Sequence, residues 1–375
     1  MDKRWWGELS LKKCGPIKEA KLRLGKINVF IGPNGSGKTI TGKILNSAFL
    51  EYFLKMMGEF LWKKEEEEYI LKLYREEFWK WLNLPENLEG EYKFRLKEEE
   101  KVRREAHRDW GLKMSKAFFN FFPRREKREE FFKLTLVLST SLLQKSFLRY
   151  VGPERLSIYE SLKEQLPYLK MFLIFVQKGM EELSIWENPI LHQKFKIEER
   201  NGEKVILELD SKVEFPYLSS GFQSSTWLDL YIRGVNKSRE REEEREFFII
   251  EEPEQHLFPS EQFELVKLFV SLVNSKSRDS ITLITHSPYI LFSLSLLMYA
   301  HYLGTQFPEK KKEVEKVIEP EYWLDPADFF GYQFNRNGEV TPIPQDEVGM
   351  ITRDVIGKVK GELDDLFDTL LELEE

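Results

Sequence analysis

Apolar and polar residues are spaced like β-strands at the start of the chain and like a helix just after it. Between Glu8 and Ile31, the runs ELSL, KEAKLRL and KINVFI are separated by Gly15-Pro16 and Gly25, as in short strands joined by turns. After Lys38 the apolar spacing is that of one helix face, formed by Ile40, Ile44, Leu45, Ala48 and Phe49. This opening predicts strands, a glycine-rich turn and a helix in succession.

The later strand signals are short apolar runs and two hairpin turns. The runs are SFLRYVGPER, REFFIIEE and SITLITHS, and a segment with helical spacing, Pro259 to Asn274, separates the last two. Asn-Gly pairs at 201–202 and 337–338 predict the turns of two β-hairpins. Helical spacing also covers Leu156 to Trp186 and about Met350 to Leu373.

A segment of different composition interrupts these signals. From about Glu51 to Arg149 the chain is dominated by Lys, Glu, Arg and aromatic residues with helical spacing, which predicts a helical insertion over residues 51–145. The sequence contains no repeat or low-complexity linker, so we expect one discontinuous domain formed by residues 1–50 and 146–375, ending in a hairpin and helix within residues 320–375. The mixture of strands and helices predicts an α/β fold, with a central mixed sheet flanked by helices.

Composition narrows the class of protein. Of the 375 residues 41% are hydrophobic, enough for a large core, and the net charge of -7 means that nucleic acid would need a local basic patch. The single cysteine, Cys14, excludes an internal disulfide and cysteine-rich metal sites. The sequence shows no signal-peptide apolar region and no uncharged apolar run long enough for a membrane span. We therefore expect a cytoplasmic protein without a membrane partner.

One glycine-rich stretch predicts a phosphate-binding loop. GPNGSGKT, residues 32–39, fits the pattern G-x-x-x-x-G-K-[ST] between an apolar strand and an amphipathic helix. There, backbone N–H groups and the helix N-terminus converge on an anion, which predicts nucleotide contacts from Gly32, Asn34, Gly35, Ser36 and Gly37. Lys38 would contact the β- and γ-phosphates of ATP, and the Thr39 hydroxyl would bind Mg²⁺. The alternative is a glycine-rich turn that only caps the helix.

An apolar strand ends in carboxylates, in the stretch FFIIEEPEQHLFP. A nucleotide site needs an acid near Mg²⁺ and a base for the attacking water. We expect Glu251 to lie in the magnesium shell and Glu252 to act as the general base. The alternative is an ordinary polar exit from a core strand.

Two further segments suit the same site. In LSSGFQ, Ser219, Ser220 and Gly221 precede a helix whose N-terminus could bind phosphate, although such a turn can also be a simple helix cap. The run ITLITHS ends in His286, a candidate contact for the γ-phosphate, although a lone histidine is often structural.

In this order the segments resemble the head domain of an ABC-type ATPase. The similarity is stronger to AAA-family ATPases of the overcoming-lysogenization-defect (OLD) type, which are related to SMC and RecF heads. It rests on INVFIGPNGSGKT, YVGPER, YLSSG, IIEEPEQHLFP and ITHSPYIL. The resemblance implies a P-loop NTPase fold of ABC type, with the insertion lying between the phosphate loop and the signature turn.

The resemblance also implies how two copies would assemble. In such heads two protomers enclose two ATP molecules, so Ser219, Ser220 and Gly221 would touch the partner's nucleotide, giving an ATP-dependent homodimer. Glu254 and His256 would lie at the dimer seam. OLD nucleases carry a Toprim domain after the head, but the segment after His286 has no Asp-x-Asp pair, so we expect no nuclease centre here.

Two segments outside the motifs have a distinct character. Residues 101–128 combine about ten Lys and Arg with three Asp and Glu, interleaved with aromatics, which suits contacts with DNA or RNA or, equally, a solvated helical face. The last segment presents its apolar residues on one side, which suits docking on its own domain or on a partner protein. Its apolar side chains are Val355, Val359, Leu363, Phe367 and Leu370.

The sequence supports three hypotheses of function. The first is a slow ATPase that dimerises on ATP and acts on nucleic acid in genome maintenance or anti-phage defence. The second is an ATP-gated sensor or scaffold that holds or releases a separately encoded effector protein. The third, the ATPase subunit of a transporter, is disfavoured by the large insertion and by the Glu-Pro-Glu-x-His stretch.

Overall fold

The computed structural model describes seven stretches of the chain: residues 3–61, 90–97, 148–151, 176–200, 203–238, 247–275 and 279–352. Residues 101–128, for which nucleic-acid contacts are predicted, lie outside the described residues, and so does nearly all of the predicted C-terminal helix.

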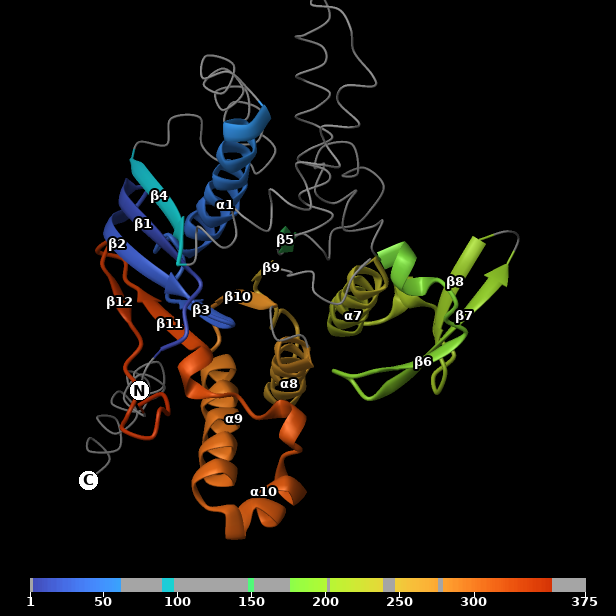
Figure 1. The fold of residues 1–375 in the computed structure, drawn as a ribbon. Helices are drawn as coiled ribbons and strands as arrows, with labels where there is room; N and C mark the ends of the chain where they lie inside the picture. Colours follow the sequence, from blue (N-terminus) through green and yellow to red (C-terminus); the bar gives the residue numbers. More distant parts are fainter. Residues whose placement is uncertain are drawn as a thin grey trace, which may run out of the picture.

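A six-stranded mixed sheet forms the centre of the molecule (Figure 1). Its spatial order is β12-β11-β3-β10-β9-β5, and every neighbouring pair is parallel except β11 and β12. The three middle strands are buried along their whole length, as expected for parallel strands covered on both faces. The strands are β3 (Ile27–Ile31), β5 (Leu148–Val151), β9 (Phe247–Glu251), β10 (Ser280–Thr285), β11 (Phe329–Phe334) and β12 (Val340–Pro342).

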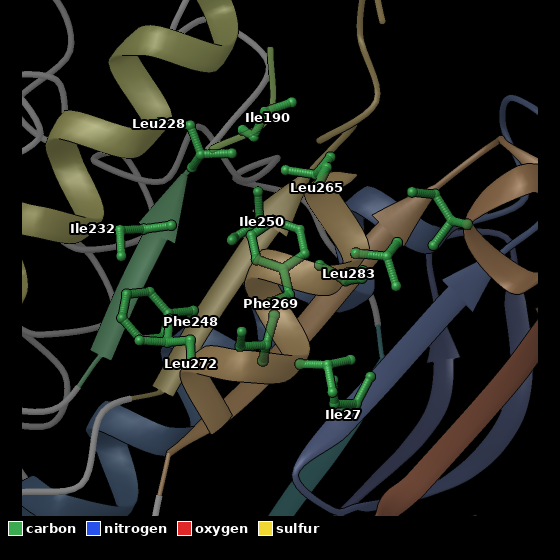
Figure 2. Close-up of a cluster of buried hydrophobic side chains, with 14 of the residues drawn as sticks. Ile27, Ile190, Leu228, Ile232, Phe248, Ile250, Leu265, Phe269, Leu272 and Leu283 are labelled. Carbon is green, nitrogen blue, oxygen red and sulfur yellow. The ribbon is translucent and has the colours of Figure 1, made fainter. Parts of the chain in front are cut away.

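Helices cover the sheet, and their apolar faces complete the core. Figure 2 shows Phe248, Ile250 and Leu283 of the sheet packed with side chains from α8, among them Leu265 and Phe269. Burial of such apolar surface is the main favourable term in folding. The helices are α1 (Lys38–Leu61), α7 (Ser220–Ser238), α8 (Pro259–Ser275), α9 (Pro288–Gln306) and α10 (Lys311–Val317), and the short turns are η5 (Phe215–Tyr217), η6 (Pro308–Lys310), η7 (Pro320–Tyr322) and η8 (Pro326–Asp328).

Two three-stranded antiparallel sheets accompany the central one. The first, β2-β1-β4, joins β1 (Gly7–Cys14), β2 (Ile17–Leu24) and β4 (Glu91–Leu96). The second, β6-β7-β8, joins β6 (Ile185–Asn188), β7 (Gln193–Arg200) and β8 (Glu203–Glu208). Both hairpins predicted from Asn-Gly pairs are present, as β7–β8 and β11–β12.

Two sequence predictions differ from the structure. The insertion is not wholly helical, because residues 91–96 form a strand whose backbone pairs with β1, from Gly7↔Leu96 to Lys12↔Glu91. The helix expected up to Trp186 also stops earlier, because Trp186 lies on β6, paired with Phe195 and buried. At residues 91–96 the partner strand is distant in sequence, whereas Trp186 pairs within a hairpin; in both places strand pairing overrides the local helical spacing. Among the described residues, no helix is long and apolar enough to cross a bilayer.

Candidate nucleotide-binding site

The predicted site residues meet at one edge of the central sheet. Thr285 at the end of β10 pairs with Ile31 at the end of β3, and Ile284 pairs with Glu251 at the end of β9. Because the three strands are parallel, the loops that follow them leave from the same edge. In open α/β sheets, this carboxyl edge is where ligands bind. The topology therefore brings together the phosphate loop, the acidic stretch and His286.

Glycines shape the phosphate loop, residues 32–39. At Gly32, where φ is +156°, an added Cβ would lie 2.1 Å from the Phe334 carbonyl oxygen of β11. At Gly37, where φ is +98°, it would lie 2.9 Å from Ile17 Cγ1 of β2. Gly35, in contrast, has φ of +76°, and apart from its two chain neighbours no described residue has an atom within 4 Å of its Cβ position. The loop is thus packed against two strands at its ends, while its tip at Gly35 is open.

Lys38 is the buried cation of the site. Its side chain is only 3% exposed, and Nζ donates a hydrogen bond of 2.8 Å to the Pro33 carbonyl oxygen within the loop. Burial lowers the pKa of Lys38 to about 8, although the nearby negative charges of Glu252, Glu251 and Glu254 act in the opposite direction. All three glutamates are therefore close enough to influence Lys38.

Glu252 has an unusual backbone and a restrained carboxylate. Its φ is +45°, in the left-handed region that a residue with a Cβ seldom adopts, and its N–H donates to the Ile284 carbonyl oxygen at 2.7 Å. One carboxylate oxygen lies 3.7 Å from His286 Nε2, and the other accepts a hydrogen bond from Gln255 Nε2. Such strain persists where surrounding contacts enforce it, and it is enriched at functional sites.

Glu254 connects the acidic stretch to the end of β10. Its Oε1 accepts hydrogen bonds from Thr285 Oγ1 at 2.6 Å and from the His286 N–H at 2.9 Å. Glu251, in contrast, is a buried residue at the end of β9. The side chains of Glu252 and Glu254 therefore both reach the segment that carries His286, by different contacts.

The turn that precedes α7 touches the acidic stretch of the same chain. A Cβ on Gly221 would lie 2.5 Å from the His256 carbonyl oxygen, so the two backbones are in close contact. Ser219, Ser220 and the His256 side chain are exposed, and His256 has a positive φ of +62°. In Figure 1, β9 lies between α7 and α1, the helix that follows the phosphate loop.

Comparison with protein families identifies the domain. A family model described as AAA ATPase domain matches residues 86–291, a range that begins after the phosphate loop and includes Glu251, Glu252, Glu254 and His286. The chain belongs to the AAA ATPase domain family. The predicted fold class, an α/β P-loop NTPase with a central mixed sheet flanked by helices, is thereby confirmed. A comparison with curated proteins found no match to this ATPase.

Solved structures of ATPase heads are also similar to this ATPase. One is the Smc head domain from Pyrococcus furiosus bound to the C-terminal domain of ScpA, with 12% identity over 99% of this chain and 100% of that one, and a TM-score of 0.37. Another is the SMC head domain from Thermotoga maritima, with 12% identity over 92% of this chain and 100% of that one, and a TM-score of 0.37. A third is a post-hydrolysis dimer of an ATP-binding cassette bound to ADP and Pi, with 10% identity over 90% of this chain and 100% of that one, and a TM-score of 0.34. The identification rests on the family match.

The residues of this ATPase domain suit a magnesium nucleotide. Ser36 Oγ, Glu254 Oε2 and Gln255 Oε1 are buried polar atoms without a hydrogen-bond partner in the described structure, and all three belong to the phosphate loop or the acidic stretch. Within the described ranges, no group of three or more His, Cys, Asp or Glu side chains could hold a metal alone. Mg²⁺ fits such a site, because it is commonly held by one or two protein ligands together with substrate phosphates.

Two residues that contact the predicted set were not singled out from the sequence. Gln255 donates to Glu252, and Thr285 donates to Glu254, so each restrains a glutamate of the acidic stretch. Both lie within quoted motifs, next to predicted residues. The sequence signal for Thr285 is a polar residue closing an apolar strand, whereas nothing in the sequence indicates which way Gln255 points.

Proposed function

We propose that this ATPase binds ATP with Mg²⁺ on the phosphate loop and hydrolyses it with Glu252 as general base. The observation that carries the proposal is the constrained position of Glu252. Its backbone is held in a left-handed conformation at the edge of the sheet, and its carboxylate lies between His286 and Gln255. Lys38, the buried cation of the adjacent loop, is close enough for the charge of Glu252 to influence its pKa.

Each side chain has a defined part in this reaction. Lys38 and the backbone N–H groups of the loop bind the phosphates, and the negative charge of the nucleotide favours the protonated form of Lys38. Glu252 accepts the proton of the attacking water, and His286 contacts the γ-phosphate. Thr39 and Glu251 would hold Mg²⁺, which, when bound, neutralises charge on the phosphates.

We further propose that ATP joins two copies of the chain. The turn formed by Ser219, Ser220 and Gly221 begins the 19-residue helix α7, and its two serines are exposed and available to a nucleotide held by a second copy. Tyr217 lies two residues before this turn, Phe258 lies within the acidic stretch, and both are highly exposed. Exposed aromatics are enriched at protein interfaces. Glu254 and His256 would then lie near the seam, and turnover by a single copy would be slow.

The variant Glu252→Gln tests the base and the dimer separately. We expect it to retain ATP binding and to lose turnover by about 10²–10⁴-fold, because a general base contributes that much and glutamine cannot accept the proton. With hydrolysis blocked, ATP should convert the variant to a dimer in multi-angle light scattering. Glu313→Gln, an exposed glutamate on α10, is the matched control and should behave like the unaltered protein.

The outcomes of this test are distinct. Rapid hydrolysis by Glu252→Gln would contradict the role of Glu252. Loss of turnover in a protein that remains monomeric with ATP would support the base and contradict ATP-dependent dimerisation. Loss of ATP binding, measured by calorimetry with the unaltered protein as reference, would mean that Glu252 acts in binding instead of catalysis.

We also propose that the cycle acts on nucleic acid, in genome maintenance or anti-phage defence. The support is the sequence of residues 101–128, with its basic and aromatic residues, and the resemblance to OLD-type ATPases. DNA or RNA should then stimulate ATP hydrolysis, and the effect should fall steeply with salt. An effector protein that copurifies only with the ATP-bound form, without such stimulation, would favour the sensor or scaffold hypothesis instead.

A further inference from the structure

Helix α9 has an apolar face that the described residues leave exposed. Its 19 residues include no Asp, Glu, Lys or Arg. Ile290, Leu294 and Leu297 are fully buried. The exposed large apolar side chains follow spacings of three, four and three residues, which places them on one side of the helix. They are Tyr289, Phe292, Leu296 and Tyr299, each 37–54% exposed, and we refer to them as the α9 stripe.

The size of the α9 stripe limits what can cover it. From these exposed fractions and about 150–250 Å² for each aromatic side chain, the stripe presents on the order of 400 Å². A stable dimer buries roughly 800 Å² on each partner, about twice as much. One amphipathic helix attached to the same chain needs less, because tethering gives it an effective concentration in the millimolar range. The area therefore favours an occupant in cis over a second copy.

The chain supplies such an occupant close by. The last described residues return to the buried side of α9, away from the stripe: Ile351 is buried and forms a bridge with Gln345, whose Nε2 lies 3.7 Å from the buried Met298 Sδ. Residues 353–375 follow. As a helix they would extend about 34 Å at 1.5 Å per residue, against about 15 Å for the α9 stripe. The segment is therefore long enough to cover the stripe from where the described chain ends.

The sequence of residues 353–375 matches this surface in polarity. Its apolar residues recur every three or four positions, as on one face of a helix, and those named above run from Val355 to Leu370. From Gly361 onward it contains acids and no Lys or Arg. The stripe itself is uncharged, and the exposed lysines Lys310 to Lys312 lie beyond the end of α9, between the exposed Glu309 and Glu313. The match is therefore one of polarity, between the apolar face of the segment and an apolar stripe.

We propose that residues 353–375 dock in cis on the α9 stripe, with their apolar side chains against Tyr289, Phe292, Leu296 and Tyr299. Docking requires neither ATP nor a second copy, so it stands or falls separately from the proposed hydrolysis. Because α9 begins two residues after His286, the docked segment covers a helix that starts at the nucleotide site.

Hydrogen–deuterium exchange of the full chain without nucleotide tests the docking. In the unaltered protein, we expect amides of residues 353–375 to exchange about tenfold more slowly than in Phe292→Asp, because a charge in the stripe releases the segment. The double variant Leu363→Asp/Phe367→Asp places charges on the apolar face of the segment itself, and its amides in residues 353–375 should lose the same protection. Ile185→Asp on β6 is the matched control, because Ile185 is 55% exposed and Phe292 is 54% exposed. It should leave the protection unchanged.

The contrary outcomes are equally clear. Unprotected amides in residues 353–375 of the unaltered protein would overturn the proposal. So would protection that survives Phe292→Asp, which would mean docking elsewhere. A dimer in light scattering that Phe292→Asp dissociates, with exchange in residues 353–375 unchanged, would assign the stripe to a second copy. If Phe292→Asp lowers the melting temperature of the whole protein, the Leu363→Asp/Phe367→Asp comparison decides the question.

Discussion

Replacing Thr285 by valine should lower the free energy of unfolding, even though the two side chains have nearly the same shape. Thr285 is fully buried at the end of β10, and its hydroxyl both donates to Glu254 Oε1 at 2.6 Å and accepts from the Ser287 N–H at 2.9 Å. Valine has nearly the same shape and suits a strand, so no cavity forms. The substitution removes a hydrogen bond to a charged group, worth about 1.5–3 kcal/mol, and leaves a buried N–H unsatisfied, which costs about 1–3 kcal/mol. We expect the free energy of unfolding to fall by about 3 kcal/mol.

Urea unfolding of the full chain without nucleotide, followed by tryptophan fluorescence, measures this change. Thr305→Val is the control, because the Thr305 hydroxyl is exposed and bonds only to the His301 and Tyr302 carbonyl oxygens of its own helix. Its effect should stay within about 0.5 kcal/mol. If Thr285→Val also changes the free energy of unfolding by less than about 0.5 kcal/mol, the Thr285 hydroxyl does not connect Glu254 to the start of α9 as described here.

Three further predictions concern the phosphate loop. Gly32→Ala should lower the free energy of unfolding by about 2–4 kcal/mol, because its Cβ would lie 2.1 Å from the Phe334 carbonyl oxygen. Gly35→Ala has open space around its Cβ and should lower it by about 1–2 kcal/mol, from backbone strain alone. Equal effects of the two substitutions in thermal unfolding would contradict the close packing of Gly32 against β11. Because burial lowers the pKa of Lys38 to about 8, the free protein loses this charge as the pH rises through 8, and the affinity for a non-hydrolysable ATP analogue should fall by up to tenfold per pH unit above it. A flat calorimetric profile up to pH 9.5 would indicate an ordinary lysine pKa. Without nucleotide, the free energy of unfolding should rise as the pH increases from 8 toward 10.5. In this window Lys38 has lost its proton in the folded protein but keeps it in the unfolded chain, so unfolding takes up a proton.

The parts of the fold that were predicted correctly are those with local signals. The strand from Ile27 to Ile31, the turn at Gly32 and the helix after Lys38 each carry their own pattern, and so do the Asn-Gly hairpins. The strand at residues 91–96 was missed because it pairs with β1, about 80 residues earlier in the chain, and nothing in its own composition indicates a partner at that distance. Long-range pairing of this kind is not encoded in any short window of sequence.

The candidate site likewise has features with a local sequence signal and features without one. Motif spacing predicted Lys38, Glu252 and His286 as site residues, and strand topology explains why they lie close together, because the carboxyl ends of β3, β9 and β10 are in register. The sequence did not indicate which neighbours each side chain contacts. The resemblance assigned Glu254 to a seam between two copies, whereas its Oε1 bonds to Thr285 and His286 of its own chain. A role at the seam remains a proposal, for which Glu254 Oε2 is available, because among the described residues this oxygen has no hydrogen-bond partner.

These bonds extend beyond the site. Glu254 accepts from Thr285, Thr285 accepts from the Ser287 N–H, and the Ser287 hydroxyl accepts from the Tyr289 N–H to cap α9. Ser287 Oγ also donates to Gln262 Oε1 of α8 at 2.6 Å. A ligand or a second copy that displaces Glu254 must stretch or break the first of these bonds, and the cap of α9 lies two bonds further along. Tyr289, the first residue of the α9 stripe, is at the end of this series of bonds, so the proposed docking of residues 353–375 and a displacement of Glu254 would both act on the N-terminus of α9.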